Sequence, residues 1–162
     1  MNSLKKNIPL FKVAMHSQIG PAITETLHSG FIGEGPKVAK FEKTLAFRFN
    51  NPHCLTLNSG TAGLRLSLEL IKHKSRGKVR GKVLTTPLTC FATVAPVLTS
   101  GHDIVWADIQ KDSLNIDPLK IEECLVSTEH NIKAILPVHL YGQMSDMTKI
   151  CLLYTSDAAD EL

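Results

Sequence analysis

A short apolar run at residues 54–57 stops at residues 58–62 (NSGTA), and an amphipathic helix begins directly after it. The first turn of a helix carries backbone N–H groups without intrahelical partners, and its peptide dipoles add partial positive charge. A phosphate binds well in such a place. Gly60 lets the backbone approach a ligand closely, and Ser59 or Thr61 can add a hydroxyl donor. The segment has the chemistry of a phosphate site, although an N-capped helix without a ligand explains the same residues.

Thiol and imidazole groups are the next candidates for chemistry. The chain has four widely spaced cysteines, at positions Cys54, Cys90, Cys124 and Cys151. None belongs to a Cys-x-x-Cys pair or has a histidine at metal-ligand spacing, so neither a zinc site nor a disulfide framework is indicated. Among the seven histidines only His139 has a distinctive context, the segment HLYGQ that also contains Tyr141. We therefore expect no metal ion in the site.

The composition is that of one soluble globular domain or a piece of a larger one: 162 residues, 43% hydrophobic and 20% charged. A net charge of +3 is too small to indicate nucleic acid as a partner. The basic segment at residues 72–82 contains no aromatic residue that could stack on bases, which favours a solvated loop. No apolar run is long enough for a membrane span or a secretion signal, so a cytoplasmic location is expected.

Strand and helix patterns alternate along the chain. Helices are expected at residues 36–49, 61–73, 91–100 and 118–126, the last one capped by Asp117. Strands are expected at residues 54–57, 82–86, 103–107 and 133–138. This alternation predicts an α/β fold with a mostly parallel sheet and helices on both faces. Ligands of such sheets bind beyond the carboxyl ends of the strands, which predicts a site formed by residues 58–61, 87–91, 108–109 and 139–143.

Five segments carry a resemblance to a known family. They are SGFIGEGPKVAKFEKTLA (29–46), LNSGTAGLRLSL (57–68), TTPLTCFATVAPVLTSG (85–101), DIVWADIQKDSLNID (103–117) and KAILPVHLYGQ (133–143). In this order they resemble the DegT/DnrJ/StrS family of nucleotide-sugar aminotransferases, and the resemblance extends to about Ile150. It implies the large domain of the type I aminotransferase fold, here truncated, and pyridoxal 5'-phosphate (PLP) as cofactor.

The resemblance also implies which residues bind the cofactor. Gly60, Thr61 and Ala62 would hold its phosphate. In the family an aromatic residue that stacks on the pyridine ring usually follows the threonine matching Thr89, and this chain has Cys90 in that place. A thiol packed against the ring and a cysteine with a plain packing role both remain open.

Further candidates for contact with substrate or cofactor are Ser59, Gly33, Glu34, His139 and Tyr141. Gly33 and Glu34 match a Gly-rich segment that lies near the active-site entrance in the family, where they would contact substrate or a partner subunit. A turn that merely precedes a helix is the alternative. His139 and Tyr141 follow the last expected strand and could orient substrate or cofactor, while a histidine satisfied by backbone groups is equally compatible. Asp108 is expected to cap a loop.

A PLP transaminase needs a lysine amine for covalent attachment of the cofactor and a carboxylate near the pyridine nitrogen. In the family both lie downstream of the segment that matches HLYGQ, so no catalytic residue is assigned within this chain. The segment CLLYTSDAADEL (151–162) resembles the translation of a sequencing adaptor. The expected organisation is the N-terminal part of the aminotransferase large domain at residues 1–150, followed by a non-native tail at residues 151–162.

The preferred interpretation is the N-terminal part of a PLP-dependent enzyme that moves an amino group from an amino acid, commonly glutamate, onto a keto-sugar carried by a nucleotide. Such enzymes serve the synthesis of surface polysaccharides or secondary metabolites. The full-length protein is expected to be a homodimer, and the fragment is expected to be inactive. Three alternatives remain: a sugar dehydratase of the same fold, a non-catalytic phosphate- or nucleotide-binding α/β module, and a chain that does not fold stably.

Overall fold

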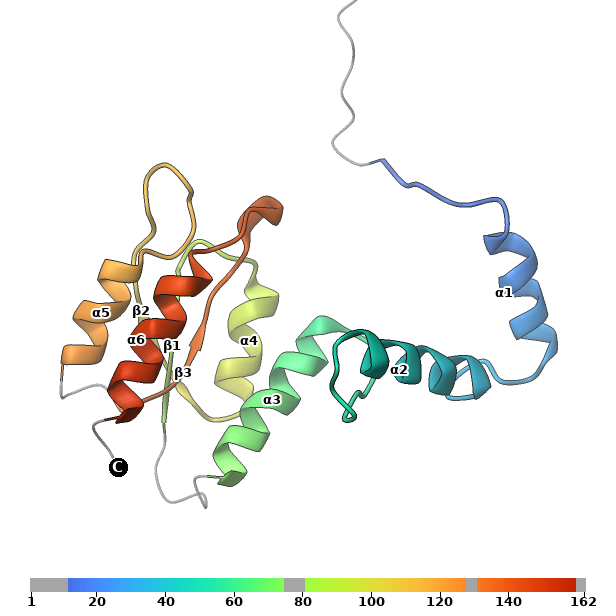
Figure 1. Cartoon of the computed structure of the whole chain (residues 1–162), viewed down its shortest axis with the longest axis horizontal. Helices are drawn as coiled ribbons and strands as arrows, with labels where there is room; N and C mark the ends of the chain where they lie inside the picture. The colour runs from blue at the N-terminus through green and yellow to red at the C-terminus, as the bar shows by residue number, and fades with distance from the viewer. Residues whose placement is uncertain (1–11, 75–80, 128–130, 160–162) are drawn as a thin grey trace, which may run out of the picture. The chain divides into compact units, whose positions relative to one another are not determined.

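The computed structural model describes residues 12–74, 81–127 and 131–159. The chain divides into two compact units, Met1–Thr56 and Leu57–Leu162 (Figure 1). The first unit contains the helices α1 (Ile19–His28) and α2 (Pro36–Arg48). The second unit contains, in chain order, α3 (Gly60–Lys74), β1 (Lys82–Thr85), α4 (Phe91–Thr99), β2 (Asp103–Trp106), α5 (Pro118–Val126), β3 (Ile132–Leu136), the 3-10 turn η1 (Leu140–Gly142) and α6 (Met147–Ala159).

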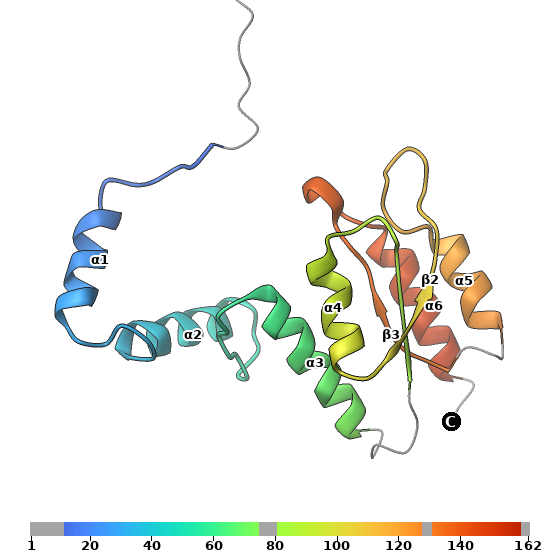
Figure 2. The same ribbon diagram turned by 180° about the vertical axis from the view of Figure 1, so that it is seen from behind.

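The second unit is built on a three-stranded sheet with the order β2-β1-β3. The central strand β1 pairs in parallel with both neighbours, so that Thr85 lies beside Trp106 on one side and beside Leu136 on the other. Figure 1 shows α5 and α6 in front of this sheet, and Figure 2 shows α4 on the opposite side. The parallel α/β architecture with helices on both faces is therefore confirmed.

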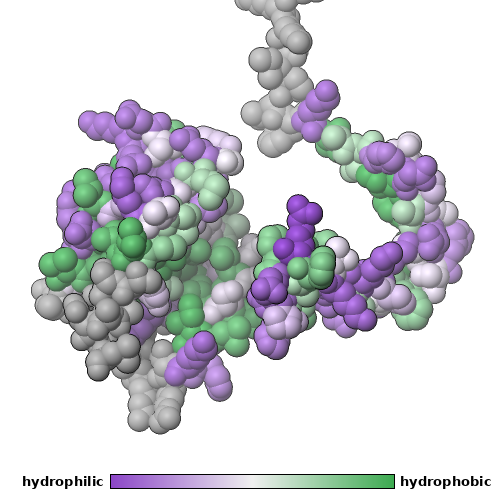
Figure 3. All heavy atoms as spheres, viewed as in Figure 1, coloured by the Kyte–Doolittle hydropathy of each residue, from purple (hydrophilic) through white to green (hydrophobic). Residues whose placement is uncertain are grey.

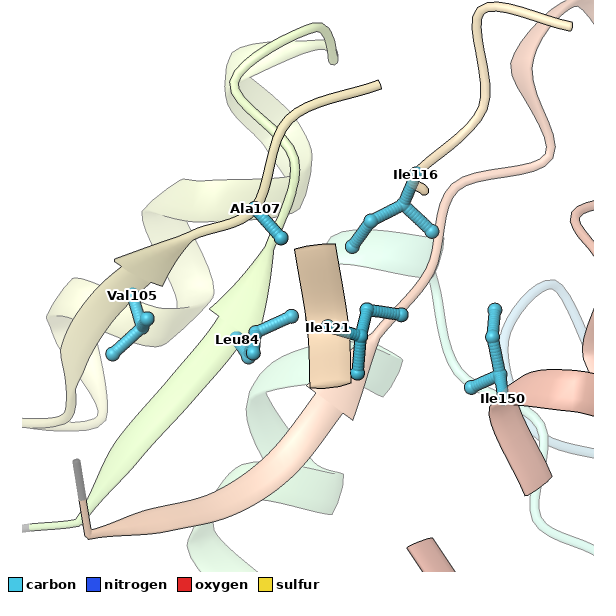
Figure 4. Packing of buried hydrophobic residues seen from close by; sticks show 6 residues of the cluster. All are labelled: Leu84, Val105, Ala107, Ile116, Ile121 and Ile150. Atoms are coloured by element: carbon cyan, nitrogen blue, oxygen red, sulfur yellow. The ribbon is translucent and has the colours of Figure 1, made fainter. Parts of the chain in front are cut away.

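Two hydrophobic clusters cover the two faces of the sheet. Neighbouring residues of a strand point to opposite faces, and the fully buried pair Val83 and Leu84 of β1 follows this rule. Leu84 packs toward α5 and α6 in a cluster that Figure 4 shows, composed of Leu84, Val105, Ala107, Ile116, Ile121 and Ile150. Val83 packs with Leu68 of α3 and Val97 of α4. Burial on both faces explains why the strands read as nearly continuous apolar runs.

Local sequence signals fix the helix starts. The Asp117 carboxylate accepts the backbone N–H of Leu119 at 3.0 Å, and Pro118 occupies the first helical position of α5. Pro36 occupies the same position in α2. The expected helices at residues 36–49, 61–73, 91–100 and 118–126 are confirmed within one residue at each end.

The first unit contains no buried residue within its described part, residues 12–56. Its helices are joined by polar contacts. The Lys37 ammonium donates to the Ala22 carbonyl at 3.1 Å and to the Thr26 hydroxyl at 2.8 Å, and α2 binds the following segment through Glu42. Large apolar side chains of the unit stay exposed, among them Ile32 and Phe47, and Figure 3 shows hydrophobic residues at the surface of both units.

The strand expected at residues 54–57 does not form, and that prediction was wrong. A strand exists through hydrogen bonds to a neighbouring strand, and none of the described strands pairs with this segment. The backbone N–H and the hydroxyl of Thr56 instead both donate to Glu42 Oε1 at 2.8 Å. These two donors stabilise the Glu42 carboxylate and lower its pKa. The helix α1, whose apolar residues Ile23 and Leu27 are exposed, was not predicted.

The last helix, α6, extends past the boundary expected at residue 150. The helix α6 runs through Ile150 to Ala159 without a break, so the backbone does not mark the boundary expected at residue 150. That boundary stays a prediction. Residues 75–80 of the basic segment expected to form a solvated loop lie outside the described residues. None of the described helices is long and apolar enough to span a membrane.

A buried histidine lies just before β2, at the amino ends of the strands. The His102 Nδ1 is 2.9 Å from the Ser100 hydroxyl, and the Lys72 ammonium donates to the Ser100 carbonyl at 3.2 Å. Burial lowers the pKa of His102 from its ordinary value of 6.5, and the charge of Lys72 lowers it further. Two carboxylates oppose this shift, those of Glu69 and Asp103.

The core geometry predicts that Ile121→Ala lowers the free energy of unfolding by about 3 kcal/mol, because it leaves a cavity under a fully buried side chain. Leu119→Ala is the matched control on the same helix, since that side chain is 65% exposed, and it should cost less than about 1 kcal/mol. Urea unfolding of the two variants and the wild type measures both values. Equal losses for the two variants would contradict the packing of α5.

The buried His102 predicts that stability falls as the pH decreases below about 6.5. The unfolded chain takes up a proton at the ordinary pKa of 6.5, whereas the folded chain resists protonation until its lowered pKa is reached. The contribution of His102 to stability is therefore complete above about pH 6.5 and is lost as the pH falls from there to the lowered pKa. Urea unfolding between about pH 8 and about pH 5 measures how the free energy of unfolding depends on pH. This pH dependence should be smaller in His102→Gln and unchanged in the variant His73→Gln, whose side chain is exposed.

Candidate functional site

The N-terminus of α3 offers two unpaired backbone donors. Ser59 caps the helix: its carbonyl accepts the N–H of Gly63 at 3.1 Å, and its hydroxyl accepts the N–H of Ala62 at 3.2 Å. The N–H groups of Gly60 and Thr61 have no acceptor within the described part of the chain. Both residues are exposed, so these amides and the helix dipole face solvent. The Ala62 N–H is therefore used by the helix cap, and the N–H groups of Gly60 and Thr61 are the two that could bind an anion.

The direction of α3 follows from its packing on α4. Because α4 follows β1, its first residue lies at the carboxyl end of that strand. The two helices pack against each other, and Lys72 near the end of α3 binds the carbonyl of Ser100 directly after α4. Their C-termini are therefore joined at one end, and their N-termini lie together at the carboxyl edge of the sheet, as Figures 1 and 2 show.

Cys90 lies at this carboxyl edge as the N-cap residue of α4. Its thiol is free and exposed and makes no capping hydrogen bond. The adjacent Thr89 hydroxyl donates to the Thr93 hydroxyl at 2.9 Å, which fixes the entry into the helix. The ring of Phe91, one position further on, is 73% exposed. The edge thus presents a thiol and an aromatic ring that are not packed into the second unit's core.

The segment after β3 forms a tight turn that carries two candidate residues. His139 Nδ1 accepts the backbone N–H of Ser145 at 3.1 Å, which requires the proton of the neutral ring to reside on Nε2. Tyr141 has φ 53° and Gly142 has φ 83°, both in the left-handed region. For a residue other than glycine this conformation costs about 1–2 kcal/mol, so the surroundings must hold it. The Tyr141 side chain is 93% exposed.

Asn115 holds this turn and was not predicted from the sequence. Its side chain is 2% exposed, and its two amide atoms bind opposite ends of the turn. Nδ2 donates to the Gln143 carbonyl at 3.0 Å, and Oδ1 accepts the N–H of Leu140 at 3.0 Å. The sequence shows no pattern that marks Asn115, because its burial and its two partners, 25 and 28 residues away, become visible only in the folded chain.

The sheet brings the predicted groups of the second unit to one edge. Thr85 and Leu136 are register partners, and the Thr85 hydroxyl donates to the Leu136 carbonyl at 2.7 Å, so β1 and β3 end side by side. Cys90 follows the first of these strands, and His139 and Tyr141 follow the second. The edge expected from the alternation of strands and helices is therefore present, with the N-terminus of α3 beside it.

Gly33 and Glu34 belong to the first unit, where both are exposed in the bend before α2. Asp108 follows β2, whose last residue Trp106 pairs with Thr85, and so belongs to the same carboxyl edge. Its carboxylate accepts the N–H of Ile109 at 2.8 Å, in agreement with the expected loop-capping role. Among the described residues no three His, Cys, Asp or Glu side chains gather where they could hold a metal ion.

Comparison with known proteins identifies relatives over most of the chain. The sequence model of the DegT/DnrJ/EryC1/StrS aminotransferase family matches residues 14–156. The spore coat polysaccharide biosynthesis protein SpsC of Bacillus subtilis is 41% identical over 129 residues, which are 79% of this chain and 31% of SpsC. The chain thus spans about a third of the length of the curated relatives that it matches.

Solved structures of sugar aminotransferases share the fold. The sugar aminotransferase CalS13 from Micromonospora echinospora superposes with a TM-score of 0.78 at 34% identity, over 94% of this chain and 40% of CalS13. NtdA from Bacillus subtilis, solved with its cofactor PMP bound, superposes with a TM-score of 0.73 at 31% identity, over 86% of this chain and 30% of NtdA. The fold is that of the PLP-dependent sugar aminotransferases, of which the chain covers a part.

Proposed function

Because the chain belongs to the DegT/DnrJ/EryC1/StrS aminotransferase family, we propose that the full-length protein is a PLP-dependent transaminase that aminates a nucleotide-linked keto-sugar. The amino donor is an amino acid such as glutamate, and the full-length protein works as a homodimer in the cytoplasm. Within this activity the 162-residue chain supplies the binding site for the cofactor phosphate. The product serves amino-sugar synthesis for a polysaccharide or a secondary metabolite.

The observation that carries this proposal is the pair of unpaired amides at the N-terminus of α3. Gly60 and Thr61 direct two N–H groups and the positive end of the helix dipole toward solvent at the carboxyl edge of a parallel sheet. A Cβ placed on Gly60 would meet no atom within 4 Å, so no distant part of the described chain packs against this glycine. A phosphate dianion fits this arrangement in charge, donor geometry and space.

PLP, when bound, supplies an electron sink and carries the amino group between the two substrates. The chain's own residues bind and orient it. Gly60 and Thr61 hold the phosphate, and the Ser59 hydroxyl keeps the first turn of α3 in place by accepting the Ala62 N–H. Cys90, exposed at the same edge, would pack against the ring in the place where the family resemblance implies an aromatic residue, and would give the ring a smaller and more polarizable neighbour.

The turn after β3 orients the reacting molecules. His139 keeps its Nε2–H free to donate, because Nδ1 is occupied by the N–H of Ser145. Tyr141 offers a phenol hydroxyl on an exposed ring. Both donors suit the oxygen atoms of a sugar or a phosphate. Gly33 and Glu34 of the first unit contact substrate or a partner subunit. The lysine that attaches the cofactor and the carboxylate at the pyridine nitrogen come from residues beyond this chain, so the chain alone does not turn over.

The full-length protein, supplied with PLP, glutamate and a nucleotide-linked keto-sugar, should form 2-oxoglutarate and amino-sugar in equal amounts. Replacement of the downstream lysine by alanine should abolish both, and the 162-residue chain should form neither. Release of a deoxygenated sugar without consumption of glutamate would show a dehydratase instead. Nucleotide binding without any change in PLP absorbance would show a binding module. Either result overturns the proposal.

The phosphate site predicts opposite effects of one substitution on two properties. Thr61→Glu places a carboxylate at the N-terminus of α3, which should stabilise the protein without cofactor by about 0.5 kcal/mol through the helix dipole. The same charge repels the phosphate and should weaken PLP binding at least about tenfold. Ser67→Glu, an exposed position on the same helix, is the matched control and should change neither property appreciably. Urea unfolding and PLP titration of the full-length protein measure both. Equal PLP affinity in the two variants would contradict the site.

A further inference from the structure

We propose that Asn115 is a positioning residue of this site: its buried amide holds the turn η1 in the conformation that presents Tyr141 to the substrate. The identity of the molecule presented to this residue rests on the proposed function. We call the two hydrogen bonds from the Asn115 side chain to Leu140 and Gln143 the clamp, and the evidence for it is independent of the proposed function. No role in contacting substrate or cofactor is assigned to Asn115.

The clamp is complete because both polar atoms of the Asn115 side chain bind the same turn. Oδ1 accepts the N–H of Leu140 at the start of the turn, and Nδ2 donates to the carbonyl of Gln143 directly after it, each at 3.0 Å. Between these two points lie Tyr141 and Gly142, the residues in the left-handed region. With its side chain 2% exposed, Asn115 has no access to water that could replace either bond.

The side of the clamp that carries Asn115 is itself anchored. The Asn115 N–H donates to the Ser113 hydroxyl at 3.2 Å, and its carbonyl accepts the N–H of Gln110 at 2.9 Å. The adjacent Ile116 pairs with Ile109 in an antiparallel bridge. The loop between β2 and α5 is thus a closed hairpin that fixes the position of Asn115. Through its two side-chain hydrogen bonds, Asn115 in turn fixes the loop between β3 and α6.

A second contact fixes the other side of the turn. The Ser145 hydroxyl donates to the Val138 carbonyl at 2.9 Å, and the Ser145 N–H donates to His139 Nδ1 at 3.1 Å. Ser145 thus sets the orientation of the His139 ring, while Asn115 sets the backbone that carries Tyr141. Because Tyr141 is 93% exposed, little of the described chain packs against its ring, and the backbone of the turn sets the point and direction from which the side chain extends.

The first test is independent of activity. In the full-length protein, Asn115→Asp keeps an acceptor for Leu140 but loses the donor and places a negative charge beside the Gln143 carbonyl. Amide exchange of the segment 139–144 should become at least about tenfold faster. Asn131→Asp, which makes the same charge change before β3, is the control and should leave this segment unchanged. Unchanged exchange in Asn115→Asp overturns the clamp.

The second test separates positioning from a general loss of structure. Asn115→Asp should lower kcat/KM at least about tenfold in the wild type but change it less than about twofold in the Tyr141→Gly background, where there is no phenol to position. A merely structural role would give the same loss in both backgrounds and would overturn the proposal. If the full-length wild type does not transaminate at all, the proposed function fails, whereas the exchange experiment still decides the clamp.

A variant at the surface covers the case in which Asn115→Asp does not fold. Gly142→Ala adds a methyl group that meets no atom within 4 Å, and it strains the turn only through the φ of 83°. It should reproduce the faster exchange of residues 139–144 and the loss in kcat/KM while Asn115 remains intact. Full activity and normal exchange in Gly142→Ala would overturn the proposal.

Discussion

The parallel pairing of β1 with both of its neighbours is the constraint on which the rest of the second unit depends. Parallel strands must all end at the same edge, so the segments after β1 and β3 are brought together although 51 positions separate the hydrogen-bonded Thr85 and Leu136. Parallel pairing also requires a crossover connection between strands, here α4 on one face of the sheet and α5 on the other, and burial on both faces favours apolar residues throughout the strands. The position of the site and the composition of the core therefore have one cause.

The phosphate site inferred at this edge consists mainly of backbone groups. Two amides and a helix dipole supply its positive character, and the side chain of Ser59 acts on the helix and not on the ligand. What the sequence must encode is the direction of α3, and the Lys72 contact to Ser100 at the opposite end of the helix pair contributes to it. The charge of Lys72 at the C-terminus of α3 favours the same orientation of the dipole. Residues far from the edge thus determine where the donors point.

The sequence predicts those features that local signals specify and misses those that depend on distant partners. Asp117 and Pro118 mark the start of α5 within the sequence itself, and the helix begins there. The apolar run at residues 54–57 indicates burial but does not show which strand it would pair with, and in the structure it forms no strand. Asn115 carries no periodic or motif signal, because its importance lies in two bonds to a loop that is 25 and 28 residues away. The pattern of apolar and polar residues along the sequence predicts which side chains become buried, whereas a hydrogen bond between two distant loops can be seen only in the folded structure.

Among the described strands, β3 has a neighbour on one side only. Beside this strand lies an apolar groove with a volume of about 600 Å³, and it is lined by Ala134 and Ile135 of β3, Ile71 of α3 and Ile150 of α6. Helices of both layers thus extend past the last described strand. Connections between parallel strands are right-handed, and α6 packs on the same cluster as α5, the helix that leads from β2 to β3. A parallel strand reached through α6 would therefore lie on the β3 edge, with apolar side chains already in place above and below it.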